Sequence, residues 1–375
     1  MPVPFRRVLA GLAVAALAGC AGTSTTAPDG ASPTPGTGAS ALPSASSVAS
    51  PTPGDDAMAG RSGDVPEGPA PDGLEALVPG NNVDADRINL ILAGDGFPSD
   101  EEFRAIAEQY VGWDGTAQPI DLDGRVAADP GDAVMAEVGL FGIDPYRSSR
   151  DLFNVWIAYD APIPEGLPSF NNATAEQEPF DLPHQSIVLL RAGDLGDLTT
   201  SVSGIDNAWV GVEEPADAGE DPFANSFVSL DLSYPVADQR LIAHELGHAL
   251  FGLLDEYIGE DGIPGNEGRP SLWPVCAQDR ETAEAWWGDL VGEVDPAIET
   301  YLDAMAEAGF PVSEDMAAEM REQVTVGYVD NGCYGDEGTY RPTQESLMNH
   351  NFPALGAVNR RHAENVLALF SGGLD

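Results

Sequence analysis

Residues 240–257, RLIAHELGHALFGLLDEY, hold two of the five histidines of this chain, His244 and His248, with Glu245 directly after the first. On an α-helix, residues four apart lie on one face, so both imidazoles can bind a single metal ion. The surrounding apolar residues predict a buried helix, in which histidines need polar partners. The pattern indicates a zinc ion with a carboxylate beside it that takes a proton from water. The alternative is a helix that carries two surface histidines by coincidence.

A catalytic zinc ion takes three protein ligands and leaves one position for water. The next donors are Asp255 and Glu256, and a continuous helix would place Asp255 roughly 10 Å beyond His248 along its axis. We therefore predict that the helix breaks at Gly252. Asp255 follows this glycine at the offset used in H-E-x-x-H-x-x-G-x-x-H, so Asp255 is the expected third ligand and Glu256 the alternative. The acid that does not bind would orient a histidine or the turn.

Three stretches together resemble the IgA-peptidase-like family of zinc metallopeptidases. Residues 244–257, HELGHALFGLLDEY, resemble its H-E-x-G-H motif with a following Asp-Glu-Tyr. Residues 88–103, INLILAGDGFPSDEEF, resemble its N-terminal strand and turn, and residues 332–350, GCYGDEGTYRPTQESLMNH, resemble its Tyr-Arg-Pro segment with a methionine after it. The match covers most of residues 87–370.

The resemblance implies a zincin-like, metzincin-like domain of the α/β (α+β) class. Such a domain has a mixed sheet, an active-site helix and a helical or irregular C-terminal half. His244 and His248 would bind one zinc ion, Glu245 would be the general base and acid, and Asp255 or Glu256 would complete the site.

The same resemblance gives other residues candidate roles. Met348 would form a methionine turn beneath the zinc ligands. The alternative is an ordinary core methionine, and the two roles hardly differ physically. Tyr257 and Tyr340 are candidate donors to a developing oxyanion, with packing as the alternative. His350 would line the cleft or lie in a solvated loop. Arg341 is expected to brace an acid such as Glu256.

The order of elements also predicts an α/β first half and a mainly helical second half. Strands are expected at 87–97, 152–160 and 186–193, and also around 208–214 and 227–232. Helices are expected at 99–111 with Ser99 as its cap, at 236–252 with Ser233 as cap and Pro235 in the first turn, and at 281–308, 313–325 and 355–370. His184 and His362 are interpreted as structural or surface residues.

The charge of the chain limits its partners. Sixteen basic and 62 acidic residues give a net charge of -46, which repels nucleic acid and anionic membrane surfaces. We therefore expect no nucleic-acid partner, and membrane contact only through a lipid anchor. A calcium ion bound by DLDG at 121–124 is a weaker hypothesis, because that stretch has only two acids of a calcium-loop pattern.

The N-terminal region reads as an export signal and a tether. Residues 1–20 combine a basic start, a short apolar run and LAGC, which resembles a bacterial lipoprotein signal with Cys20 as the lipidated residue. An ordinary cleaved signal is the alternative. Residues 21–85, rich in Ala, Pro, Ser, Thr and Gly, are expected to be a disordered tether, and residues 86–375 the catalytic domain. In an exported chain, the remaining cysteines, Cys276 and Cys333, are expected to form a disulfide.

These patterns predict an exported, lipid-anchored zinc endopeptidase that acts on extracellular proteins or peptides. The alternative is a surface binding or adhesion lipoprotein that has a metallopeptidase fold and little or no turnover. Glu245 distinguishes the two, since a binding protein has no need of it.

Overall fold

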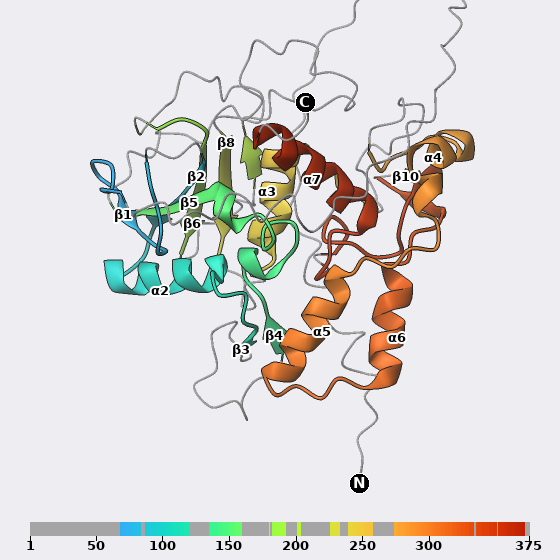
Figure 1. Cartoon of the computed structure of the whole chain (residues 1–375), viewed down its shortest axis with the longest axis horizontal. Helices are drawn as coiled ribbons and strands as arrows, with labels where there is room; N and C mark the ends of the chain where they lie inside the picture. The colour runs from blue at the N-terminus through green and yellow to red at the C-terminus, as the bar shows by residue number, and fades with distance from the viewer. Residues whose placement is uncertain are drawn as a thin grey trace, which may run out of the picture.

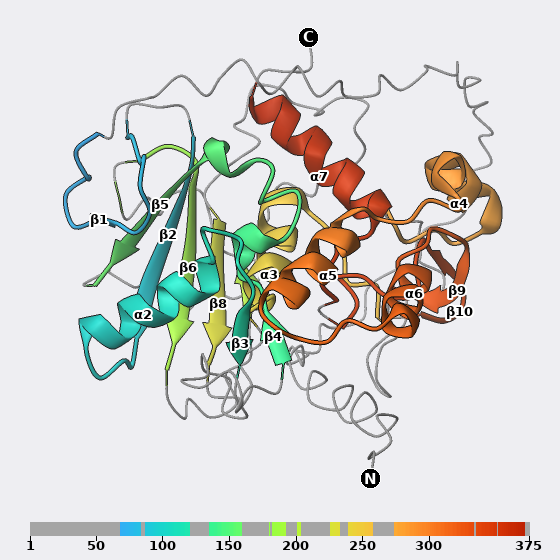
Figure 2. The same ribbon diagram turned by 60° about the horizontal axis from the view of Figure 1, so that its bottom comes forward.

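The computed structural model describes residues 68–83, 87–120, 135–159, 180, 182–192, 201–203, 226–232, 239–257, 274–333, 335–350 and 352–371. Their strands form a six-stranded sheet in one half of the molecule, and most of the later helices lie in the other half (Figures 1 and 2). Helix α3 (Leu241–Phe251) lies between the two halves in both views.

The sheet has the strand order β1-β5-β2-β6-β8-β7. Its four central strands are parallel, and the two edge strands are antiparallel to their neighbours. The strands are β1 (Glu75–Ala76), β2 (Ile88–Asp95), β5 (Phe153–Ala158), β6 (Gln185–Arg191), β7 (Ser201–Ser203) and β8 (Ser226–Asp231). This arrangement confirms the predicted mixed sheet and the α+β class.

Strand β2 is apolar on both faces because both faces are covered, as is usual for a central parallel strand. Leu90 and Leu92 belong to the main core together with helices α2 (Asp100–Val111) and α3, whereas Ile91 packs with Trp156 on the opposite face. Helix α2 starts where predicted, since the Ser99 hydroxyl accepts a hydrogen bond from the Glu102 N–H.

The second half contains α4 (Arg280–Trp287), α5 (Ala297–Glu307), α6 (Glu314–Gln323), α7 (Ala357–Phe370) and an antiparallel hairpin of β9 (Val329–Gly332) and β10 (Gly335–Arg341). The shorter elements are the β3 (Gln118–Ile120) and β4 (Met135–Glu137) pair and the 3-10 turns η3 (Leu140–Gly142), η4 (Arg150–Leu152) and η5 (Gly288–Leu290). The hairpin was not predicted, because its glycine-rich strands lack an alternating apolar pattern.

Several predicted boundaries are wrong. The expected helix 281–308 is two helices, α4 and α5, separated by a segment that contains Gly288, Gly292 and Pro296, residues that interrupt helices. The folded body begins before residue 86, since β1 pairs with β5 and Leu77 is buried. Helix α3 begins at Leu241 and not at 236, with Arg240 at its N-cap.

Other expectations lie outside the described residues. These are the signal and Cys20, the strand at 208–214, the cap Ser233 with Pro235 in the first turn, and the DLDG stretch. In the part of the chain that is described, no helix is long and apolar enough to cross a membrane.

A second, smaller core surrounds a disulfide between Cys276 and Cys333, the pair expected from the sequence. Both cysteines are buried beside Trp287 of α4 and Val358 of α7. The disulfide therefore joins the segment before α4 to the β9–β10 hairpin.

Replacing both cysteines by serine is expected to lower the free energy of unfolding by about 4 kcal/mol, because the bond closes a loop with a sequence separation of 57. Urea denaturation of the oxidised wild type and of the double variant measures this loss. A reducing agent should weaken the wild type and leave the variant unchanged. Equal urea midpoints for the two oxidised proteins would contradict the prediction.

Candidate metal centre

Helix α3 is held at both ends by buried polar contacts. At its start, Arg240 forms an ion pair with the buried Glu137 of β4, with Nε 2.9 Å from Oε2. The Tyr146 hydroxyl donates to the carbonyl of Ala243 at 3.0 Å. At its end, His362 Nε2 donates to the carbonyl of Phe251 at 2.9 Å. His362 is therefore structural, as expected.

The chain reverses direction directly after α3. Gly252 has φ 61°, a left-handed conformation that favours glycine, and the Leu253 N–H donates back to the carbonyl of Gly247 at 3.2 Å. The predicted break at Gly252 is confirmed. It returns Asp255 to the level of the histidines on α3.

Three donor atoms of His244, His248 and Asp255 converge on one point. The two Nε2 atoms are 3.2 Å apart, and Asp255 Oδ1 lies 3.1 Å from His244 Nε2 and 3.2 Å from His248 Nε2. Among the described residues this is the one group of three such side chains able to hold a metal ion. The side chain of His248 is 15% exposed, so the group reaches solvent.

Backbone carbonyls set the protonation of both imidazoles. His244 Nδ1 lies 2.8 Å from the carbonyl of Leu347, and His248 Nδ1 lies 2.6 Å from the carbonyl of Leu253. Because a carbonyl only accepts, each Nδ1 carries the proton, and in a neutral ring Nε2 presents a lone pair to the centre. Two lone pairs and a carboxylate oxygen facing one another repel unless a metal ion or a proton lies between them.

The size of this triangle fits zinc. Bonds of about 2.0 Å at tetrahedral angles place neighbouring donors about 3.3 Å apart, close to the 3.1 and 3.2 Å found here. Three protein donors leave a fourth tetrahedral position, the arrangement of catalytic zinc sites.

Burial and mutual contact shift the pKa values of the three groups. Burial lowers the pKa of His244, but the hydrogen bond and charge of Asp255, together with Glu245, raise it to about 9. The pKa of His248 is also raised, since Asp255 outweighs burial there. Burial raises the pKa of Asp255, yet its bonds to both histidines hold it well below its usual range. Without a metal, a proton on His244 therefore balances the carboxylate at pH 7.

Glu245 is buried next to this group and receives no hydrogen bond from any described residue. Burial raises its pKa, while the charges of His244 and His248 lower it. A carboxylate without a partner beside a metal site is suited to exchange protons with a bound water.

Glu256 is not in the donor group. Its Oε1 accepts hydrogen bonds from the Ser346 hydroxyl at 3.0 Å and from the Asn359 amide, and the residue is fully buried. Burial raises its pKa to about 7, although the charge of Arg341 and the bonds from Ser346 and Asn359 lower it. Arg341 braces this acid as expected, but its Nη1 donates to the Glu256 carbonyl at 3.0 Å and not to the carboxylate.

Met348 packs against α3 at Gly247. It is fully buried, and a Cβ added at Gly247 would lie 3.1 Å from its sulfur. Gly247, between the two histidines, thus lets the thioether lie directly against α3. The preceding residue, Leu347, supplies the carbonyl that orients His244.

The other candidates lie elsewhere. Tyr340 pairs through its backbone with Ala277 and packs against the disulfide core, so packing explains it. His350 has a 45% exposed side chain, and its Nδ1 lies 3.0 Å from Glu345, in agreement with a loop histidine. Tyr257 is half-buried directly after Glu256.

The residues that hold the ligands in place have little signal in the sequence. The carbonyls of Leu347 and Leu253 carry no side-chain signal, because every residue has a carbonyl. Glu137 and Arg240 are 103 residues apart in the chain, so their contact was not predictable. Only their charges and the position of Arg240 before α3 offered a signal.

A scan of the sequence against protein-family models and a search of curated proteins both find no match. The likeness to IgA-peptidase-like enzymes therefore stays an interpretation of the motifs.

Replacing Asp255 by alanine is expected to weaken zinc binding by at least about 100-fold, because it removes a donor atom. This loss exceeds the effect of replacing a residue that only orients a ligand. Glu256→Gln, which changes the neighbouring acid, is expected to stay within about threefold of the wild type. Competition with a zinc-binding dye measures both. The reverse order of effects would make Glu256 the ligand.

Zinc binding is expected to release about one proton at pH 7, because the metal displaces the proton that the raised pKa of about 9 keeps on His244. Apparent affinity should therefore increase from pH 6 to pH 8. Calorimetric titration in two buffers of different ionisation enthalpy counts the protons. A heat of binding that does not depend on the buffer would show that zinc binding releases no proton.

Proposed function

We propose that this protein is a zinc-dependent endopeptidase with a zincin-like fold, related to the IgA-peptidase-like metallopeptidases. The observation that carries the proposal is the convergence of His244, His248 and Asp255 at distances suited to tetrahedral zinc, with Glu245 buried beside them. The Gly252 turn and the packing of Met348 against α3 support it.

A zinc ion in this site would polarise the scissile carbonyl and lower the pKa of a water molecule to about 7. Glu245 takes the proton of the attacking water and then gives it to the departing amine. The carbonyls of Leu347 and Leu253 keep the imidazole rings turned so that Nε2 remains the donor. Asp255 adds one negative charge, which offsets part of the charge of a divalent ion.

The substrate class we propose is proteins or peptides outside the cell. The N-terminal sequence supports export and a lipid anchor at Cys20, with the folded body on the extracellular side. The acid excess of the chain favours such substrates over nucleic acids.

The decisive variant is Glu245→Gln, which removes the proton acceptor and keeps the size of the side chain. It should bind one zinc ion and lose at least about 100-fold in hydrolysis of casein or a peptide library. A zinc chelator should abolish the activity of the wild type, and added zinc should restore it. His350→Ala, at the exposed loop histidine, is the matched control and should keep full activity.

Zinc binding without hydrolysis by the wild type would favour the binding or adhesion protein. Equal hydrolysis by the wild type and Glu245→Gln would remove Glu245 from the mechanism.

A further inference from the structure

Asp255 is held in the molecule through the backbone of its neighbour, Glu256. The Glu256 N–H donates to the carbonyl of Met348 at 2.8 Å. The Glu256 carbonyl accepts from the Cys333 N–H at 3.2 Å and from Arg341 Nη1 at 3.0 Å. Both backbone polar groups of the residue after the third donor are therefore fixed by segments far along the chain.

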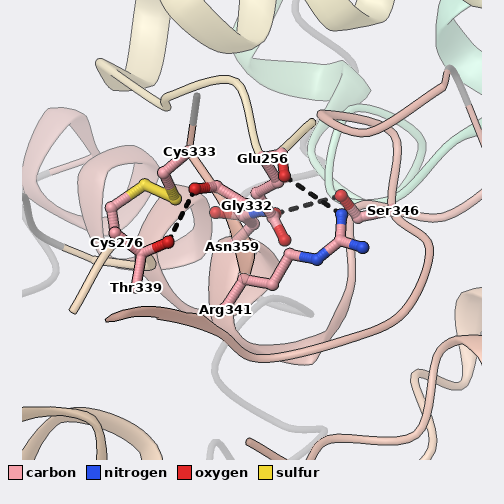
Figure 3. The surroundings of a disulfide bond; sticks show 8 residues. All are labelled: Glu256, Cys276, Gly332, Cys333, Thr339, Arg341, Ser346 and Asn359. Carbon is pink, nitrogen blue, oxygen red and sulfur yellow. Dashed lines mark hydrogen bonds between the residues drawn. A yellow bond between two sulfur atoms is a disulfide. The ribbon is translucent and has the colours of Figure 1, made fainter. Parts of the chain in front are cut away.

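Two of these contacts come from the β9–β10 hairpin, whose surroundings are drawn in Figure 3. At the turn, Asn331, Gly332 and Cys333 all have positive φ, a conformation that non-glycine residues keep only when their surroundings impose it. A Cβ added at Gly332 would lie 2.8 Å from the Glu256 carbonyl oxygen. The hairpin therefore approaches the backbone of Glu256 more closely than a residue with a side chain would allow. Thr339 further ties the turn, donating to the carbonyl of Gly332 at 2.9 Å.

The disulfide lies at this turn. It attaches Cys333 to Cys276 inside the buried second core, so the Cys333 N–H stays directed at the Glu256 carbonyl. The path from the disulfide to the third donor thus runs through Cys333, one hydrogen bond and the backbone of Glu256.

We propose that the β9–β10 hairpin, held by the Cys276–Cys333 disulfide, positions Asp255 for the metal, with Arg341 as a positioning residue. This inference rests on the proposed metal site, since it names what sets one of its donors. Without the hairpin contacts, the Glu256 carbonyl loses both of its hydrogen bonds, and Asp255 next to it is positioned less firmly for the metal than the two histidines. Groups that orient ligands typically contribute about 10- to 100-fold to metal affinity.

The test measures zinc affinity by dye competition, together with the visible absorption of the cobalt-substituted protein, which reports the ligand geometry. It uses the full-length chain. Arg341→Ala and the double variant Cys276→Ser with Cys333→Ser should each weaken zinc binding by about 10- to 100-fold and alter the cobalt spectrum. Reducing the wild-type disulfide should have the same effect as the double variant.

Two controls separate positioning from loss of stability. Phe103→Ala removes a buried ring from α2 and should destabilise the fold in urea without changing zinc affinity by more than about threefold. His350→Ala, at the exposed loop histidine, leaves the hairpin contacts in place and should also bind zinc normally. Circular dichroism confirms that each variant is folded, and Arg341→Ala alone decides the outcome if the double variant does not fold.

Unchanged zinc binding by Arg341→Ala, or equal weakening by Phe103→Ala, would overturn the positioning role. A wild type that binds no zinc would overturn both this inference and the metal site. A wild type that binds zinc but cuts no peptide, with the variants weakened as expected, would leave the inference standing and reject the endopeptidase.

Discussion

The left-handed turn at Gly252 is the constraint on which the donor group depends. A helix that continued past Phe251 would carry Asp255 roughly 10 Å away from His248. At φ 61° the chain instead folds back, so that the carbonyl of Leu253 meets one histidine and the carboxylate of Asp255 meets both. One backbone conformation thus supplies the third donor and orients the second.

Two adjacent acids after this turn have opposite surroundings. Asp255 faces the histidines, and its pKa is held well below the usual range. Glu256 faces inward, where burial raises its pKa to about 7. The difference follows from the partners of each acid. The imidazoles favour the charged form of Asp255, whereas burial disfavours the charged form of Glu256 by more than Ser346, Asn359 and Arg341 favour it. The donor group of His244, His248 and Asp255 lies where α3 of the sheet half meets the half that contains the disulfide.

Much of this arrangement could be predicted from the sequence, because it depends on local patterns. The spacing of His244 and His248 places both on one face of a helix, and Gly252 marks where that helix ends. The offset of Asp255 from this glycine favoured it over Glu256, in agreement with the geometry. The apolar run of β2 predicts a strand buried on both faces, and an even pair of cysteines in a chain expected to be exported predicts their disulfide.

Contacts between distant segments were decided only by the tertiary structure. No local pattern shows that Glu256 meets Asn359, that the Leu347 carbonyl orients His244, or that a hairpin anchors the third donor. Tyr340 and His350 share a motif with Met348, yet Met348 packs against α3, Tyr340 packs against the disulfide core and His350 lies exposed beside Glu345. Local sequence determines helix faces and turns, whereas the partners of buried polar groups depend on how the whole chain packs.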